Sequence, residues 1–174
     1  MLNWPVELLE LLALQQEAER ASQGQDLAGS FGLAATEDEL IACEHALGFR
    51  FEEHHREFLK FANGWERFSG TIDLFSTQDF LGSDRFNTAL QWIREFDSEV
   101  FGSNAVDRER LFPIGKGEGS TSLLIMKRKE ERLDSVVLWF ANEPTEEFPS
   151  FDAMFVSFKE YTKGVIEFWR SQPQ

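Results

Sequence analysis

TEDELIACEHALGFRFEEHHREFLKFANGW, residues 36–65, is the stretch that decides the predicted fold. Thr36 with Glu39 three residues later is a capping box, in which the two residues satisfy orphan amide donors at a helix N-terminus. The apolar stripe of this helix is Leu40, Cys43 and Leu47. Gly48 suits the left-handed conformation that commonly ends a helix, so the spacing predicts one short helix over 37–47.

A second short helix is predicted to begin near Glu52, where Glu52 and Glu53 lie favourably at its positive end. One face of this helix is lined by Phe51, His55, Phe58, Leu59 and Ala62. The pair Asn63-Gly64 then stops it.

The rest of the chain predicts helices first, then strands, then a closing helix. Helical spacing covers residues 4–21 and 86–96, and a loop rich in helix-breaking residues covers 22–30. Strand patterns cover residues 71–75, 111–114, 122–126 and 135–141, with a hairpin around the glycine-rich KGEG at 116–119. Ser157 with Glu160 is expected to cap the last helix, whose predicted buried face is Phe158, Tyr161, Val165 and Phe168.

This order predicts an α+β fold with an antiparallel sheet. The length of 174 residues fits a single domain. Residues 1–29, a helix and a loop, are expected to belong to the same domain as residues 30–174, because one helix is too small to stand alone.

Charge is the second informative property of the chain. It carries 17 Lys and Arg against 31 Asp and Glu, a net charge of −14. Residues 1–64 hold 12 acids and 4 bases, a balance of −8, whereas residues 111–174 hold 10 acids and 8 bases, a balance of −2. Such a protein repels phosphate backbones and anionic lipid, so nucleic-acid and membrane binding are not expected. An acidic surface suits a basic protein partner, although it also serves solubility alone.

A single cysteine, Cys43, excludes an internal disulfide, and no secretory signal is recognised before the first helix. The apolar run 8–14 is too short and too interrupted to cross a bilayer. These features predict a cytoplasmic protein.

Three blocks of sequence, over roughly residues 30–163, resemble the SUKH superfamily, which is named partly after a yeast cell-wall synthesis regulator. The first block is the helix pair quoted above. The second is LFPIG at 111–115 with GEG at 117–119 and the strand LLI at 123–125, and the third is FVSFKEY at 155–161. The chain departs from the family pattern at Phe51-Glu52, where Leu-Pro is common, and at Ser120, where an acid is common.

The resemblance implies an α+β fold with helices packed on a curved, mostly antiparallel sheet, and it implies a binding protein rather than an enzyme. Most bacterial members look like immunity proteins, so the expected partner is a cognate protein toxin. The net charge of −14 suits a basic toxin, such as a nuclease. The alternative is an intracellular regulator or scaffold without a toxin partner. The candidate partner-binding residues are Trp65, Asp73, Glu118, Trp139, Glu143, Glu146, Glu147, Phe151 and Asp152.

Within this set, Trp65, Trp139 and Phe151 are expected to anchor the contact. The acids are expected to steer the partner, especially those of a predicted loop over 143–152. Burial of Phe148 and Phe151 beneath that loop is the alternative. Glu44 lies on the apolar stripe of its helix and is expected to be a buried pairing residue, with a partner contact as the alternative.

No catalytic residues, metal ligands or cofactor are predicted. Cys43, His45, His54 and His55 cluster in sequence, but their spacing does not converge as a zinc site requires. Cys43 lies on an apolar stripe, where cysteines are inert. The glycine-rich GKGEGS at 115–120 lacks the order of a phosphate-binding loop, and no Ser-His-Asp arrangement has the context it needs.

Overall fold

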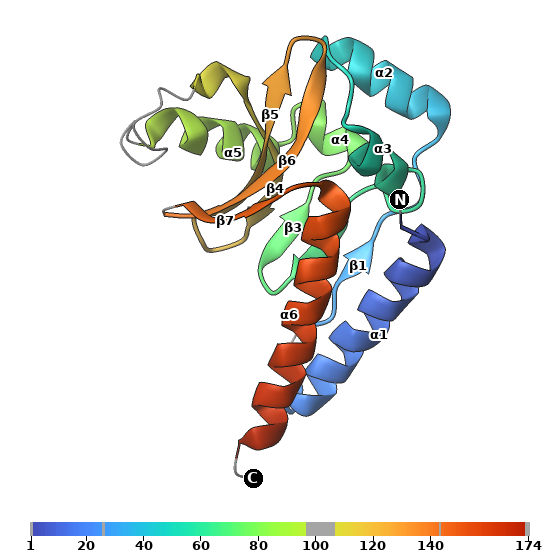
Figure 1. Cartoon of the computed structure of the whole chain (residues 1–174), viewed down its shortest axis with the longest axis vertical. Helices are drawn as coiled ribbons and strands as arrows, with labels where there is room; N and C mark the ends of the chain where they lie inside the picture. Colours follow the sequence, from blue (N-terminus) through green and yellow to red (C-terminus); the bar gives the residue numbers. More distant parts are fainter. Residues whose placement is uncertain (1, 26, 97–106, 143, 173–174) are drawn as a thin grey trace.

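The computed structural model describes residues 2–25, 27–96, 107–142 and 144–172, and over these residues the fold is α+β. The helices are α1 (Trp4–Ala21), α2 (Glu37–Leu47), α3 (Glu53–Leu59), α4 (Thr77–Phe80), α5 (Asp84–Glu95) and α6 (Phe151–Ser171), with a 3-10 turn η2 (Arg108–Arg110). The strands are β1 (Ser30–Phe31), β2 (Trp65–Ser69), β3 (Ile72–Leu74), β4 (Leu111–Gly117), β5 (Ser122–Lys129), β6 (Arg132–Ala141) and β7 (Pro144–Phe148). Each strand pairs antiparallel with the next along the chain, which gives an open sheet with edges at β1 and β7 (Figure 1). The predicted fold class is confirmed.

The helix pair of residues 36–65 forms as its caps predict. Thr36 and Glu39 make the capping box of α2, and Gly48 ends the helix at a φ of 75°, in the left-handed region. The carboxylate of Glu52 accepts a hydrogen bond of 3.0 Å from the backbone N–H of His55 and so caps α3.

Helices cover both faces of the sheet. On β6, Trp139 packs on Phe158 of α6 with 5.3 Å between ring centroids, whereas its neighbour Phe140 packs on Phe96, just after α5, at 4.5 Å. Adjacent residues of a strand point to opposite faces, so α6 and the α5 end lie on opposite sides of the sheet. The central strand β5 is accordingly apolar without alternation over 123–126.

Helices α1 and α6 run side by side and parallel, and they extend beyond the sheet (Figure 1). Asp152 accepts a hydrogen bond of 3.1 Å from the backbone N–H of Leu2, Lys159 pairs with both Glu7 and Glu10, and Arg170 pairs with Glu17. In each of these contacts the two residues lie about 150 positions apart in the sequence, and this separation stays nearly constant because the helices are parallel.

Gln15 fastens α1 to the sheet. This side chain is 2% exposed, and its amide nitrogen donates to the carbonyls of Arg67 at 3.0 Å and Phe68 at 2.8 Å. Its amide oxygen accepts from the backbone N–H of Gly29 at 3.3 Å. One buried amide therefore connects α1, β2 and the segment that leads into β1.

Three expectations from the sequence are wrong. The predicted loop over 143–152 contains strand β7, because residues 144–148 pair with β6. Helix α6 begins at Phe151 with Ser150 as its cap, so Ser157 lies inside the helix. Tyr161 and Phe168 are 58% and 56% exposed, because the second half of α6 lies beyond the sheet and α1 packs on another face of the helix.

Candidate functional site

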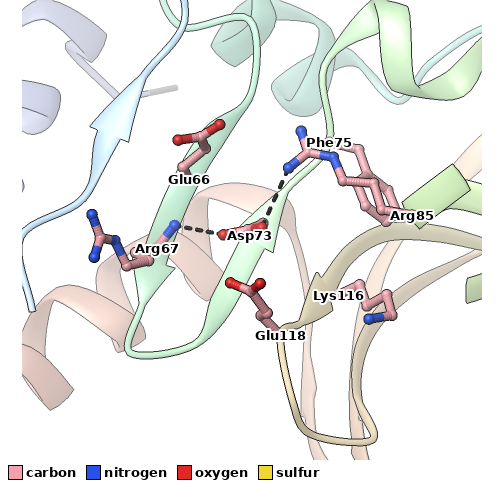
Figure 2. A pocket seen from close by; sticks show the side chains of 7 residues that line it. All are labelled: Glu66, Arg67, Asp73, Phe75, Arg85, Lys116 and Glu118. Atoms are coloured by element: carbon pink, nitrogen blue, oxygen red, sulfur yellow. Dashed lines mark hydrogen bonds and ion pairs between the residues drawn. The ribbon is translucent and has the colours of Figure 1, made fainter. Parts of the chain in front are cut away.

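A cleft of about 500 Å³ opens between strands β2, β3 and β4, and we call it the β2–β4 cleft (Figure 2). Its lining residues are Glu66, Arg67, Asp73, Phe75, Arg85, Lys116 and Glu118. Asp73 on β3 lies at its centre with 18% of its side chain exposed. The Asp73 carboxylate accepts from the backbone N–H of Arg67 at 2.6 Å and from a guanidinium N–H of Arg85 at 3.3 Å.

Arg85 is held in place as part of the cleft wall. It makes two hydrogen bonds to Asp79, of 2.7 and 2.5 Å, and its guanidinium lies 5.6 Å from the centre of the Phe75 ring. Burial opposes ionisation of Asp79, but hydrogen bonds from Arg85 and Ser76 outweigh it and lower the pKa of Asp79 to about 2. Arg85 and Asp79 therefore stay charged and paired at neutral pH.

Two carboxylates in the cleft have no ion-pair partner among the described residues: Glu66 on β2 and Glu118 just after β4. Both are exposed, and Figure 2 shows them on either side of Asp73. The nearby cation Lys116 lies 4.4 Å from the centre of the Trp92 ring and donates to the carbonyl of Gly117 at 3.1 Å. The cleft thus offers two exposed carboxylates, of which Glu66 also attracts Arg85, to the ammonium or guanidinium groups of a partner.

The structure brings together Asp73 and Glu118, both of which were predicted as partner-binding residues. It adds Glu66 and Arg67, which the sequence reasoning missed because strand β2 was not predicted. Arg67 has a φ of 51°, so β2 is irregular at this point and lacks the clean alternation that marks a strand.

The distinctive residues of the 36–65 stretch hold the fold. The Glu44 carboxylate is 12% exposed and accepts from the backbone N–H of Phe51 at 3.0 Å and from Arg56 at 3.1 Å, so the predicted structural role is confirmed. Asn63 exchanges two hydrogen bonds with Thr77, of 2.9 and 2.8 Å, and ties the end of α3 to the start of α4. Gly64 has a φ of 84°, and an added Cβ would lie 3.0 Å from Ser76.

A comparison with known protein families matches residues 34–161 to the SMI1/KNR4 family (SUKH-1). The match covers about three quarters of the chain and includes all the strands from β2 to β7. This chain belongs to the SMI1/KNR4 family. A search among curated proteins found no match.

Two aromatic residues predicted as anchors are unavailable to a partner in this SMI1/KNR4 protein. Trp65 and Phe151 are 1% and 0% exposed and lie in the hydrophobic core, where Phe151 stacks on His55 with 4.9 Å between ring centroids. The structure therefore confirms the alternative prediction for Phe151, which was burial in the core. Trp139 is half-buried against Phe158 and retains part of its surface.

The acidic residues predicted over 143–152 do not share one surface. Glu146 and Glu147 are exposed on the edge strand β7, on opposite faces of the sheet. Asp152 instead binds the backbone N–H of Leu2 and lies 2.9 Å from the Nδ1 atom of His54, so it joins α6 to the start of α1 and to α3. Glu143 lies outside the described residues.

The described residues were compared with what a metal site and a cysteine nucleophile require. Among these residues, no group of three or more His, Cys, Asp or Glu side chains could hold a metal ion. Burial, with the nearby Glu44 carboxylate, raises the pKa of Cys43 to about 11, so its thiol is not a nucleophile at neutral pH. No helix in the described residues is long and apolar enough to cross a membrane.

Proposed function

We propose that this SMI1/KNR4 family chain is a non-enzymatic immunity protein that neutralises a cognate protein toxin by binding it. The observation that carries the proposal is the family match over residues 34–161. The net charge of −14 supports a basic partner, because complementary charge accelerates encounter between proteins.

Two surfaces are suited to the contact. The β2–β4 cleft offers the exposed carboxylates of Glu66 and Glu118 beside Asp73, in a hollow suited to a Lys or Arg side chain. The β7 edge offers Glu146 and Glu147, next to the partly exposed ring of Trp139. In this proposal the cleft holds the basic side chain and the edge steers the approach.

Protection and complex formation test the proposed activity directly. The chain is co-expressed with the protein encoded beside its gene, and growth and co-purification are measured. Protection of the cells together with a stable complex is expected. If the neighbouring protein is toxic, and the chain neither protects nor binds, the immunity function is wrong.

Charge-reversal variants distinguish the contribution of the β2–β4 cleft to toxin binding from that of the β7 edge. Glu66→Lys with Glu118→Lys is expected to weaken toxin binding at least about tenfold and to flatten its salt dependence, because two attractive charges become repulsive. Glu146→Lys with Glu147→Lys is expected to act mainly on the association rate, as rim charges do. Glu109→Lys with Glu167→Lys has the same charge change at exposed positions elsewhere and serves as the control. Equal effects from all three pairs would mean that net charge, and not either surface, governs binding.

The second candidate is a regulator or scaffold of the same family without a toxin partner, since the SUKH superfamily is named partly after a yeast cell-wall synthesis regulator. Genomic position discriminates between the two. A neighbouring gene for a secreted or repeat-rich toxin supports immunity, and its absence supports the regulatory role.

A further inference from the structure

The two edges of the open sheet differ in how they are protected. Edge strand β7, PTEEF, carries a proline and two glutamates, residue types that commonly prevent a sheet edge from pairing with another chain. At the other edge, β1 belongs to the segment LAGSFGLAA at 27–35, which has no charged residue and no proline. The β1 edge therefore lacks the usual protection, although charged residues make up 28% of the chain.

One side of this segment is joined to the sheet. Strand β1 pairs antiparallel with residues 65–66 of β2. The backbone N–H of Gly32 donates to the carbonyl of Gly64 at 3.0 Å. The backbone N–H of Ala35 donates to the carbonyl of Leu59 at 2.9 Å. The segment thus continues beyond β1 as one edge of the sheet.

The other side of the segment has unused backbone groups. In an antiparallel ladder, successive residues alternate between facing the paired strand and facing away from it. Because Gly32 faces β2, the N–H and C=O groups of Phe31 point away from β2. The next amide, that of Leu33, donates to no carbonyl among the described residues. Gly32 is exposed and has no side chain, so solvent reaches the backbone itself at this point.

Apolar side chains flank the exposed backbone. Leu33 is 93% exposed, and Phe61, which lies between the two carbonyls that hold the segment, is 40% exposed. The ring of Phe31 packs on Trp65 with 5.0 Å between ring centroids, which fixes β1 against the sheet. A strand added at this edge would therefore bury Leu33 and Phe61 as well as using the free main-chain groups.

Charge around the edge favours a basic partner. Residues 21–67, which form the elements around it, hold nine acids and four bases, a balance of −5. Internal ion pairs, such as those of Arg56 with Glu37 and Glu44, leave this balance unchanged. Next to β1, the Glu66 side chain is exposed. A second copy of the chain carries the same net charge of −14 and is repelled.

We propose that the β1 edge docks an extended segment of a protein partner, flanked by Lys or Arg, which pairs as an additional strand with residues 31–33. A strand is the occupant that fits, because the alternating N–H and C=O groups of an edge are satisfied by another strand about 4.8 Å away. Residues 31–33 precede the family match over 34–161, so this edge belongs to the chain's own N-terminal part. The inference holds whether or not the partner is a toxin.

Selection from a displayed library of random peptides of about ten residues, the upper length of most strands, tests the site. Wild-type protein is the bait, and the Leu33→Pro protein is used for counter-selection. Enriched peptides are expected to alternate β-branched or aromatic residues with polar ones, to lack a central proline and to carry Lys or Arg near their ends. Leu33→Pro is expected to leave the fold intact, because Leu33 is 93% exposed and its N–H makes no internal bond, and thermal denaturation checks this.

NMR titration with the most enriched peptide measures the pairing itself. Saturable shifts and at least about tenfold slower hydrogen exchange are expected at the amides of Phe31 and Leu33. Leu33→Pro is expected to weaken binding at least about fivefold, because a main-chain donor is lost and the ring occupies the place of the added strand. Leu33→Ser keeps the N–H and removes only the apolar side chain, so it is the matched control and is expected to weaken binding less.

Three results would contradict the proposal. Enrichment of acidic peptides or of peptides with a helical pattern, or an equal loss of affinity in the Leu33→Ser and Leu33→Pro proteins, would overturn main-chain pairing with a basic segment. A library without any peptide that distinguishes wild type from Leu33→Pro would overturn the docking site. Sedimentation of the free protein is expected to show a monomer, and a dimer that Leu33→Pro dissociates would make the occupant a second copy of the chain.

Discussion

His55 is a titratable side chain enclosed by phenylalanines. It is 1% exposed, stacks on Phe151, and meets Phe51 and Phe80 edge-on with 5.4 and 6.0 Å between ring centroids. Its Nδ1 atom has no hydrogen-bond partner among the described residues. Desolvation lowers the pKa of His55 from 6.5 to about 3, so the imidazole is neutral in the folded protein.

The stability of the protein should therefore fall in mild acid because of His55. The pKa is lower in the folded state than in the unfolded chain, so the unfolded state takes up the proton first as the pH falls. His55 has no effect above about pH 6.5 and destabilises by about 1.4 kcal/mol for each pH unit between 6.5 and 3.

His55→Phe should remove this acid sensitivity and fit the aromatic surroundings. Between about pH 7 and pH 5, the wild-type protein is expected to lose about 2 kcal/mol more free energy of unfolding than the variant does. Urea denaturation at the two pH values measures the difference. His45→Phe, at an exposed position of α2, is the control, and an equal loss in wild type and His55→Phe would contradict the assignment.

At the scale of the elements, the capping-box spacing of Ser157 and Glu160 predicted the wrong start for α6. Ser157 with Glu160 matches the capping-box spacing, but Ser150 caps the helix, with its hydroxyl oxygen accepting from the backbone N–H of Ala153 at 3.1 Å. The first turn, FDAM, carries Phe151 and Met154, which are buried against the rest of the core. Phe151 packs on Trp4 of α1 and on His55 and Phe58 of α3, so the helix starts where its apolar face meets these two helices.

Ser150→Ala should cost about 1 kcal/mol of unfolding free energy, because an N-cap hydrogen bond is lost. Ser157→Ala should be neutral or slightly stabilising, because alanine is the better residue inside a helix. Equilibrium urea denaturation of the two variants measures both effects. A larger loss for Ser157→Ala than for Ser150→Ala would contradict this placement of the cap.

The elements with strong local signals could be predicted from the sequence, and those that depend on tertiary pairing could not. The caps at Thr36 and Gly48 and the apolar run of β6 are local, and they fold as predicted. Strand β7 could not be predicted, because PTEEF has little β character and exists through pairing with β6. Strand β1, with two residues, has no sequence pattern at all.

The same distinction applies to the candidate site. Asp73 and Glu118 could be named because acids beside a strand and a turn are visible in sequence. Their meeting with Glu66 depends on the register of β3 with β2 and β4, which the sequence does not specify. The anchoring role of Trp65 was wrong because an aromatic residue after a helix stop is equally compatible with core and surface.

At the scale of the whole molecule, α1 is part of the core although the family match begins only at residue 34. Trp4 is 2% exposed and contacts Phe58 and Phe155 edge-on, with 5.4 and 5.1 Å between ring centroids. Leu8 and Leu11 are also buried. The matched region alone therefore lacks one wall of its own core.

A shortened protein that begins at Ser30 should fail to unfold cooperatively, because the rings packed on Trp4 become exposed. In the full chain, Trp4→Ala should cost about 3–5 kcal/mol, as large-to-small core substitutions do. Thermal denaturation followed by circular dichroism measures both. Leu9→Ala, at a position that is 65% exposed, is the control and should change stability by less than about 0.5 kcal/mol. Sharp cooperative melting of the shortened protein would show that α1 is dispensable.

The parallel pairing of α1 with α6 also delays the packing of α1 during synthesis of the chain. Residues that pair between the two helices are about 150 positions apart, so the ribosome needs roughly 8–30 s at usual rates to produce the partner of each residue in α1. During that interval Trp4, Leu8 and Leu11 have no α6 on which to pack. Until α6 emerges, this part of the apolar side of the first helix is open to chaperones and to aggregation.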